Sequence, residues 1–168
     1  MNEFVKKLRE ARVKQIGAVL IALDPGETTG WAAFHSCVLL AAGFTKNPYE
    51  VIDLLPQETR DPDRVVIELP QYYPRKTKSV ADLITLAVLV GELRGLWLRR
   101  CSSRQDVELV WPTTWKGSTP KDIHNERVLG KLYDGEVEKL QKSPRSKKWN
   151  HNMLDAVGLG LWKLTRMS

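Results

Sequence analysis

Runs of apolar residues separated by turn residues dominate the first third of the chain. Residues 16–24 form a continuous aliphatic run that ends at Asp24 and is followed by a Pro-Gly turn. Such a run is typical of a strand buried on both faces. Two shorter runs, 30–34 and 38–42, predict two further strands that form an antiparallel meander with the first.

In the rest of the chain, helical periodicity alternates with short strands. Residues 64–69 and 106–111 are β-rich and a proline follows each run, so they predict a fourth and a fifth strand. Helical patterns cover residues 1–15, 48–55, 79–100, a segment opened by Thr119 as N-cap and Pro120 as first residue, and 151–164. This order predicts an α/β fold with a central five-stranded mixed sheet flanked by helices, preceded by an accessory basic helix over residues 1–15.

The helix predicted over residues 79–100 has an extended apolar pattern. We expect its buried side to consist of Leu83, Leu86, Ala87, Val90, Leu93 and Leu96. Further apolar residues, Ile84, Leu89 and Trp97, exceed what one buried face needs. They indicate either a contact between two copies of the chain or complete burial within one copy.

Length and charge limit what the chain can bind. The chain has 168 residues, of which 42% are hydrophobic and 27% charged, enough for one globular domain with its own core. With 26 Lys and Arg against 20 Asp and Glu, the net charge of +6 favours a polyanionic partner, nucleic acid before an anionic membrane surface. Basic residues outnumber acidic ones by seven to two in 72–104 and by seven to one in 139–168.

Cysteine content and hydropathy predict a cytoplasmic protein with no membrane span. Cys37 and Cys101 are too few for a disulfide framework and suit a reducing compartment. The longest uncharged stretch, 28–45, is broken by Gly, His and Ser, which favours strands over a membrane helix. The N-terminal segment is charged throughout and lacks the apolar core of a secretory signal.

Three carboxylates lie at the ends of predicted elements: Asp24 and Glu68 close strands, and Asp155 lies early in the last helix. A carboxylate held against a sheet needs a cation or hydrogen-bond donors to offset its desolvation. Converging carboxylates suit Mg²⁺ or Mn²⁺, and a pair of such ions is an arrangement that hydrolyses phosphodiesters. Together with the basic surface, the three residues predict a nuclease.

Two of these carboxylates also have simpler interpretations. Asp24, before a Pro-Gly turn, is a residue that accepts local amide hydrogen bonds. Asp155 favours the N-terminal half of its helix through the helix dipole. Glu68 has no local partner in the sequence that would explain it in this way.

Four segments carry motifs in a defined order. They are Asp24-Pro-Gly-Glu-Thr-Thr-Gly-Trp-Ala, Val66-Ile67-Glu68, Trp115-Lys116-Gly117-Ser118-Thr119-Pro120-Lys121 and His151-Asn152-Met153-Leu154-Asp155-Ala156. Together they resemble the motifs of RuvC-type Holliday junction resolvases, most closely the forms encoded by bacteriophages. The resemblance covers nearly the whole chain, from about residue 16 to residue 164.

The resemblance implies an RNase H-like nuclease domain over residues 16–168 and a homodimer. It also implies Mg²⁺-dependent paired nicking of four-way or branched DNA that leaves 5′-phosphate and 3′-hydroxyl ends, as in a crossover junction endodeoxyribonuclease of DNA recombination and repair. Two Mg²⁺ ions are expected, with Mn²⁺ as a substitute. If the chain is phage-encoded, its location is the cytoplasm of the bacterial host.

The resemblance further implies that Asp24, Glu68 and Asp155 are metal ligands. The family commonly has Asp or His three residues before the final Asp, where this chain has Asn152, with His151 one residue earlier. Both offsets lie on one helical face, so we favour His151 as fourth ligand and keep Asn152 as the other candidate. His151 is alternatively a helix-start residue beside the basic loop.

Lys116 and Lys121 resemble family lysines that reach the scissile phosphate. As catalytic residues they would stabilise the charge that grows on the phosphoryl group in the transition state. General anchoring of phosphate is the alternative, and it would affect binding more than turnover.

Two further segments are predicted to bind DNA. In the family, a loop at this place after Glu68 carries an aromatic residue that stacks on bases opened at the junction centre. Tyr72 or Tyr73 suits that role, or else covers the sheet edge. Sequence-independent, salt-sensitive phosphate contacts are expected from Arg75, Lys76, Lys78, Lys142, Arg145, Lys147 and Lys148.

Two other functions remain open from the sequence. One is an RNase H-fold nuclease that acts on RNA or an RNA–DNA hybrid, since the shared metal chemistry does not specify the sugar. The other is a catalytically silent DNA-binding module, which the retention of all three carboxylates disfavours. The turn after Asp24 is also similar to the phosphate loop of actin-like ATPases, but 168 residues leave no room for the second domain that those need.

Overall fold

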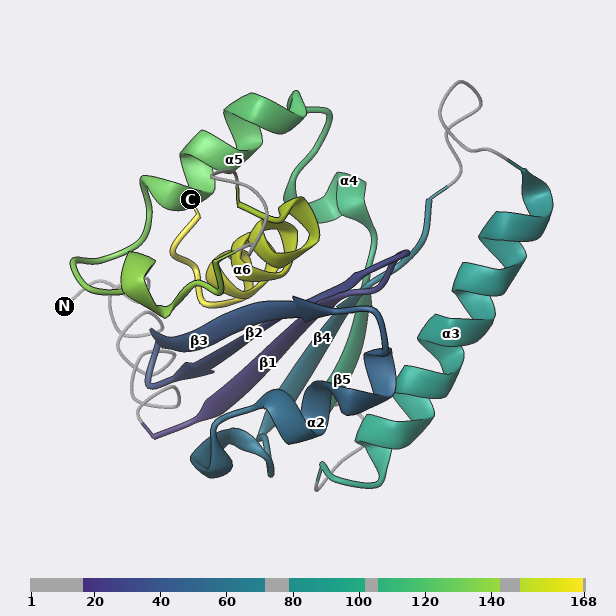
Figure 1. The fold of residues 1–168 in the computed structure, drawn as a ribbon, viewed down its shortest axis with the longest axis horizontal. Helices are drawn as coiled ribbons and strands as arrows, with labels where there is room; N and C mark the ends of the chain where they lie inside the picture. Colours follow the sequence, from purple (N-terminus) through teal and green to yellow (C-terminus); the bar gives the residue numbers. More distant parts are fainter. Residues whose placement is uncertain (1–16, 72–78, 102–105, 143–148, 168) are drawn as a thin grey trace, which may run out of the picture.

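Five strands form one mixed sheet, and helices cover both of its faces (Figure 1). The computed structural model describes residues 17–71, 79–101, 106–142 and 149–167. In chain order the strands are β1 (Val19–Asp24), β2 (Thr29–His35), β3 (Val38–Thr45), β4 (Arg64–Glu68) and β5 (Val107–Val110). Their spatial order is β3-β2-β1-β4-β5. The predicted α/β class and the five-stranded mixed sheet are therefore confirmed.

The direction of each strand follows from the length of its connection. Short turns join β1 to β2 and β2 to β3, so these strands pair antiparallel. Longer, helix-containing connections let β4 run parallel to β1 and β5 parallel to β4. Leu23 lies opposite Ile67 in the parallel pair, so the next residues, Asp24 and Glu68, end neighbouring strands at the same edge of the sheet.

The helices are divided between the two faces of the sheet (Figure 1). One face carries η1 (Pro48–Glu50), α2 (Val51–Leu54) and α3 (Val80–Leu98), and η2 (Gln57–Thr59) follows in the connection to β4. The other face carries α4 (Pro112–Trp115), α5 (Lys121–Leu129) and α6 (His151–Lys163), with η4 (Val137–Lys139) beside β3.

Alternation along the strands assigns their residues to two separate cores. Ala22 of β1 and Val66 of β4 belong to the core under α6, and the residues on either side of them belong to the core under α3. Because the side-chain period of a strand is two, Asp24 and Glu68 point to the same face as Ala22 and Val66. Both carboxylates therefore lie on the α6 side of the sheet.

Helix α6 packs closely on the sheet because two glycines leave room for it. A Cβ at Gly30 would lie 1.9 Å from the carbonyl oxygen of Asn152, and a Cβ at Gly160 would lie 2.2 Å from the ring of Phe34. Neither position can hold a larger residue without moving backbone or a buried ring. The first turn of α6 is thereby held against the end of β1.

Helix α3 corrects one expectation from the sequence. The fully buried residues are Val90, Leu93 and Trp97, while Leu83, Leu86 and Leu96 are half-buried and Ala87 is exposed. The 19 residues of α3 span about 28 Å, whereas the five residues of β4 span about 17 Å, so the helix is longer than the sheet it covers. Complete burial of its apolar residues within one copy of the chain is therefore wrong.

Smaller differences concern the ends of elements. Thr119 is not the N-cap of α5, which begins at Lys121 after Pro120 and has no side-chain cap. Strand β5 is one residue shorter at each end than predicted, and the short helix α4 that follows it was not predicted. A single helical turn opened by a proline carries no periodic apolar pattern, which explains the omission.

Two predictions concern segments at the limits of the structure. The accessory helix expected over residues 1–15 lies outside the described residues. None of the helices in the described ranges is long and apolar enough to cross a membrane.

Candidate active site

The carboxyl ends of β1 and β4 open into a cavity of about 630 Å³ beside α6. Asp24, Glu68 and Asp155 all line it, although they come from two strands and a helix far apart in the sequence. Two lysines line the same cavity. Lys116 lies at the C-terminal end of α4, and Lys121 is the first residue of α5. Five of the six residues predicted to be catalytic thus meet in one place.

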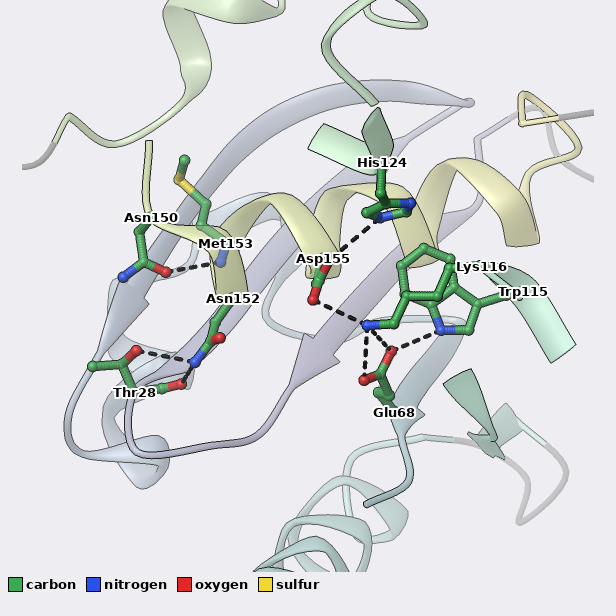
Figure 2. A network of polar contacts seen from close by, with 9 residues as sticks. All are labelled: Thr28, Glu68, Trp115, Lys116, His124, Asn150, Asn152, Met153 and Asp155. Atoms are coloured by element: carbon green, nitrogen blue, oxygen red, sulfur yellow. Dashed lines mark hydrogen bonds and ion pairs between the residues drawn. The ribbon is translucent and has the colours of Figure 1, made fainter. Parts of the chain in front are cut away.

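Local structure fixes the helix that carries Asp155. Asn150 is the N-cap of α6, and its Oδ1 accepts a hydrogen bond of 3.1 Å from the amide of Met153. Asn152 then ties the helix to the turn after β1, since its Nδ2 donates to the carbonyl oxygen of Thr28 and, at 3.1 Å, to Thr28 Oγ1 (Figure 2). These contacts place Asp155 one helical turn inside α6, beside the strand ends.

Lys116 is the cation between two of the carboxylates (Figure 2). Its Nζ lies 3.0 Å from Asp155 Oδ2, 3.1 Å from Glu68 Oε2 and 3.2 Å from Glu68 Oε1. The ammonium bridges a strand end and a helix that are 39 or more residues from it along the chain. In this arrangement Lys116 neutralises part of the negative charge of the cavity.

Two aromatic residues contact the same carboxylates from behind. Trp115 Nε1 donates a hydrogen bond of 2.8 Å to Glu68 Oε2, and His124 Nε2 lies 3.3 Å from Asp155 Oδ1. His124 is only 3% exposed and also lines the cavity. In the sequence, His124 carries no motif and is most simply a structural residue. The sequence could have indicated a role for this histidine only through its position three residues after Lys121, on the same side of a predicted helix.

The pKa shifts report an excess of negative charge at this site. Burial, together with the negative charges of Glu68 and Asp155, raises the pKa of Asp24 well above its ordinary value. Burial likewise raises the pKa of Glu68, although Lys116 opposes the shift. A carboxylate whose ionised form is disfavoured in a cavity lined by other charged groups is typical of a functional site.

Asp155 and Lys116 shift in the directions expected of ion-pair partners. Burial disfavours ionised Asp155, but the close contacts with His124 and Lys116 outweigh it and lower the pKa of Asp155. Burial also disfavours the Lys116 ammonium, yet the charges of Glu68, Asp155 and Asp24 outweigh it and raise the pKa of Lys116. Lys116 therefore stays protonated at neutral pH.

The donor set fits a hard divalent cation by its chemistry. Carboxylate oxygens are the ligands that Mg²⁺ and Mn²⁺ prefer, and three carboxylates, including the buried Asp24, converge here. Within the described ranges no group of three or more His, Cys, Asp or Glu residues lies at the spacing of a formed metal site. The ammonium of Lys116 occupies the space between Glu68 and Asp155, so a cation would have to displace it to reach both.

The two candidates for a fourth ligand differ in their surroundings. The amide of Asn152 is engaged with Thr28. His151 is the first residue of α6, is exposed, and is not among the residues that line the cavity. Partial burial and the positive charge of Lys121 lower the pKa of His151, which favours the neutral imidazole that a metal requires.

Most of the predicted DNA-binding residues fall outside the described residues. These are Tyr72, Tyr73, Arg75, Lys76, Lys78, Arg145, Lys147 and Lys148. Lys142 is described and is exposed. Gln71, which immediately precedes residues 72–78, lines the cavity.

Comparison of the chain with models of known protein families and with curated proteins finds no match. The chemistry open to the cavity is given by its own side chains. It combines three acids suited to a divalent cation with two lysines suited to a phosphate.

Proposed function

We propose that this chain is a metal-dependent, structure-selective endodeoxyribonuclease of the RuvC type. It resolves Holliday junctions or other branched DNA by paired nicks that leave 5′-phosphate and 3′-hydroxyl ends. The observation that carries this proposal is the meeting of Asp24, Glu68, Asp155, Lys116 and Lys121 in one cavity. A chance likeness between short sequence segments would not require these distant residues to converge.

The arrangement of strands supports the finer proposal of an RNase H-like fold. An antiparallel meander is extended by two parallel strands, and the first and fourth strands carry their acids side by side. A helix bearing the third acid packs on the same face.

Asp24, Glu68 and Asp155 would hold the Mg²⁺ or Mn²⁺ ions, with His151 as the proposed fourth ligand. When bound, the ions supply charge neutralisation and an activated water for phosphodiester hydrolysis. With the ions in place, Lys116 would be free to turn its ammonium from Glu68 and Asp155 to the phosphate, where it would stabilise the charge of the transition state. Lys121, the first residue of α5, lines the same cavity and contacts the phosphate as well.

The basic residues of segments 75–78 and 142–148 supply the affinity for DNA. Phosphate contacts from Lys and Arg make binding steeply salt-dependent and independent of sequence. Replacing Lys147 and Lys148 by Gln is expected to lower the slope of log affinity against log salt by about 0.9 for each phosphate that is no longer neutralised. An unchanged slope would assign these lysines to a solvated surface.

A homodimer is part of the proposal because paired nicks in opposite strands need two sites. The N-terminal half of α3 offers a surface for it, since Val80, Ile84 and Val88 are 62%, 59% and 56% exposed. These residues recur every four positions and so form one apolar stripe. Sedimentation of wild type against Ile84→Glu tests this surface, and a monomeric wild type would contradict it.

The decisive experiment is cleavage of a labelled synthetic four-way junction, compared with linear duplex, splayed DNA and an RNA–DNA hybrid. Each is incubated with Mg²⁺, Mn²⁺ or chelator, using wild type, Asp24→Asn and the matched exposed control Asp134→Asn. We expect paired nicks that require both metal and Asp24, with a loss on the order of 10³-fold or more in Asp24→Asn and junction binding retained.

Each other outcome replaces this proposal with a different one. Metal-dependent cutting of the hybrid alone moves the substrate to RNA. Tight junction binding without cutting on any substrate favours the silent DNA-binding module. Near-normal cleavage by Asp24→Asn removes that residue from the metal site.

A further inference from the structure

Two buried rings form a contact pair behind the acidic cavity. Trp115 at the end of α4 is 7% exposed, and His124 on α5 is 3% exposed. Their ring centroids lie 5.1 Å apart at an interplanar angle of 71°, an edge-to-face contact. Helix α6 has Gly158 where the rings rest, and a Cβ there would lie 2.9 Å from Trp115 Cζ3 and 3.3 Å from His124 Nε2.

Each ring directs one nitrogen at a different carboxylate. Trp115 Nε1 donates to Glu68 Oε2 at 2.8 Å, and His124 Nε2 lies 3.3 Å from Asp155 Oδ1 (Figure 2). His124 Nε2 is buried and makes no hydrogen bond to any of the described residues, and Asp155 Oδ1, 3.3 Å away, is the acceptor that it faces. A hydrogen bond there requires the proton of the imidazole to be on Nε2.

Both carboxylates also face the ammonium of Lys116. Its Nζ lies 3.0 Å from Asp155 Oδ2, 3.2 Å from Glu68 Oε1 and 3.1 Å from Glu68 Oε2, the oxygen that also accepts from Trp115. Each acid therefore lies between a buried ring and the positive charge. Such contacts are expected of an outer layer of donors that orients cation ligands.

We propose that Trp115 and His124 act as one positioning unit, which fixes the carboxylates of Glu68 and Asp155 so that an oxygen of each faces a divalent cation. The inference rests on the proposed metal-dependent function and goes beyond it, since neither ring is among the residues proposed to hold the cation or the DNA phosphate. Because the rings contact each other, loss of one donor lets the other ring move, and the two effects are not additive.

The test measures Mn²⁺ affinity of the full chain by calorimetry, without DNA. Trp115→Phe keeps a ring and removes the donor, His124→Leu removes the second donor, and His124→Gln restores an N–H. The matched controls are Trp162→Phe, at a half-buried position of α6, and His35→Leu, at the end of β2 that lies away from the cavity. Thermal unfolding in chelator identifies any variant that loses its fold.

We expect each donor-removing variant to bind Mn²⁺ about 10- to 100-fold more weakly. The double variant should lose less than the product of the two single effects, His124→Gln should recover part of the loss, and the controls should match wild type. Junction cleavage is measured in parallel, and kcat should fall while KM for the junction stays constant.

Mn²⁺ affinity equal to wild type in folded Trp115→Phe and His124→Leu would overturn the positioning unit. So would strictly multiplicative effects, because they would make the rings independent. If wild type cuts junctions while these variants bind Mn²⁺ normally, only the positioning unit fails. If the variants weaken Mn²⁺ binding but wild type cuts no junction, only the resolvase function fails, and a wild type that binds no Mn²⁺ overturns both.

Discussion

Two buried acidic residues of this protein have pKa values that are shifted in opposite directions. Glu136 and Asp24 are comparably inaccessible, at 2% and 8% exposure. Burial disfavours the charge of Glu136, but hydrogen bonds outweigh it and lower the pKa of this residue. Burial and neighbouring acids instead raise the pKa of Asp24. A buried carboxylate therefore stabilises the fold at Glu136 and destabilises it at Asp24.

Glu136 is fully paired. Its carboxylate accepts hydrogen bonds from the amides of Leu39 and Tyr133, both at 2.6 Å, and a two-pronged contact from Arg166 at 3.0 and 2.7 Å. Arg166 also donates to the carbonyl oxygens of Cys37 and Lys131 and lies 3.8 Å from the centre of the Tyr133 ring. These donors offset the desolvation of the carboxylate, so the pair joins β3 to the end of the chain.

The acids of the cavity beside α6 are less completely paired than Glu136. Asp24 makes no side-chain hydrogen bond to any of the described residues, and the charges of Glu68 and Asp155 add to its desolvation. One ammonium, that of Lys116, is shared between the other two acids. A buried acid without a hydrogen-bond donor among the described residues costs stability, and the proposed cation would offset that cost.

The largest effect that separates the two regions is expected from Arg166→Ala. Removing the cation from a buried pair leaves an uncompensated charge and is expected to cost about 3–5 kcal/mol of unfolding free energy. Urea denaturation with and without Mg²⁺ measures this cost, and both conditions should give the same value. A loss below about 1 kcal/mol would show that Glu136 does not depend on its partner.

Added metal should stabilise only the cavity. With free Mg²⁺ at 100 times its dissociation constant, wild type is expected to gain about 2.7 kcal/mol, and chelator should remove the gain. The variant that carries both Asp24→Asn and Asp155→Asn should lose this response, while Glu136→Gln should keep it. Thermal unfolding measures all three, and an undiminished response in the double variant would place the metal elsewhere.

Neutralising one acid in each region should give effects of opposite sign. In chelator at pH 8, Glu136→Gln is expected to destabilise the fold by about 1.5–3 kcal/mol because charged hydrogen bonds are weakened. Asp24→Asn is expected to stabilise it by about 0.5–2 kcal/mol because an unpaired buried charge is removed. Asp134→Asn, on the exposed surface, is the control, and a destabilised Asp24→Asn would end the contrast.

The smallest effects are the pH dependences of those differences, each limited to about 1.4 kcal/mol per pH unit. The folded-state pKa of Glu136 is lowered, so its contribution is present above about pH 4 and is lost as pH falls through that lowered value. The folded-state pKa of Asp24 is raised, so the advantage of Asp24→Asn grows as pH rises above about 4 and levels off beyond the raised value. Unfolding measured from about pH 2 to about pH 8 should show the Glu136 trend below about pH 4 and the Asp24 trend above it, and parallel curves would refute them.

Local pattern was enough to predict much of the fold. The runs that end at Asp24 and Glu68 are strands β1 and β4, and the final helix begins at His151 as predicted. Periods of two and of about 3.6 residues record which side chains share a face within one element, and that record is in the sequence itself. The three acids were found in this way, because each lies at a fixed place in its own element.

Contacts between different elements produce no comparable periodicity in the sequence. His124 and Asp155 lie on different helices, Glu136 and Arg166 on different loops, and Asn152 meets Thr28 across 124 positions. The exposure of the N-terminal half of α3 likewise depends on the length of the sheet beneath it. The elements, the acids at their ends and the basic charge of the chain follow from the sequence, because they depend on composition and on neighbours within a few residues. Which donors meet those acids follows only from the packed fold, because strand register and helix packing bring together residues whose spacing in the chain is arbitrary.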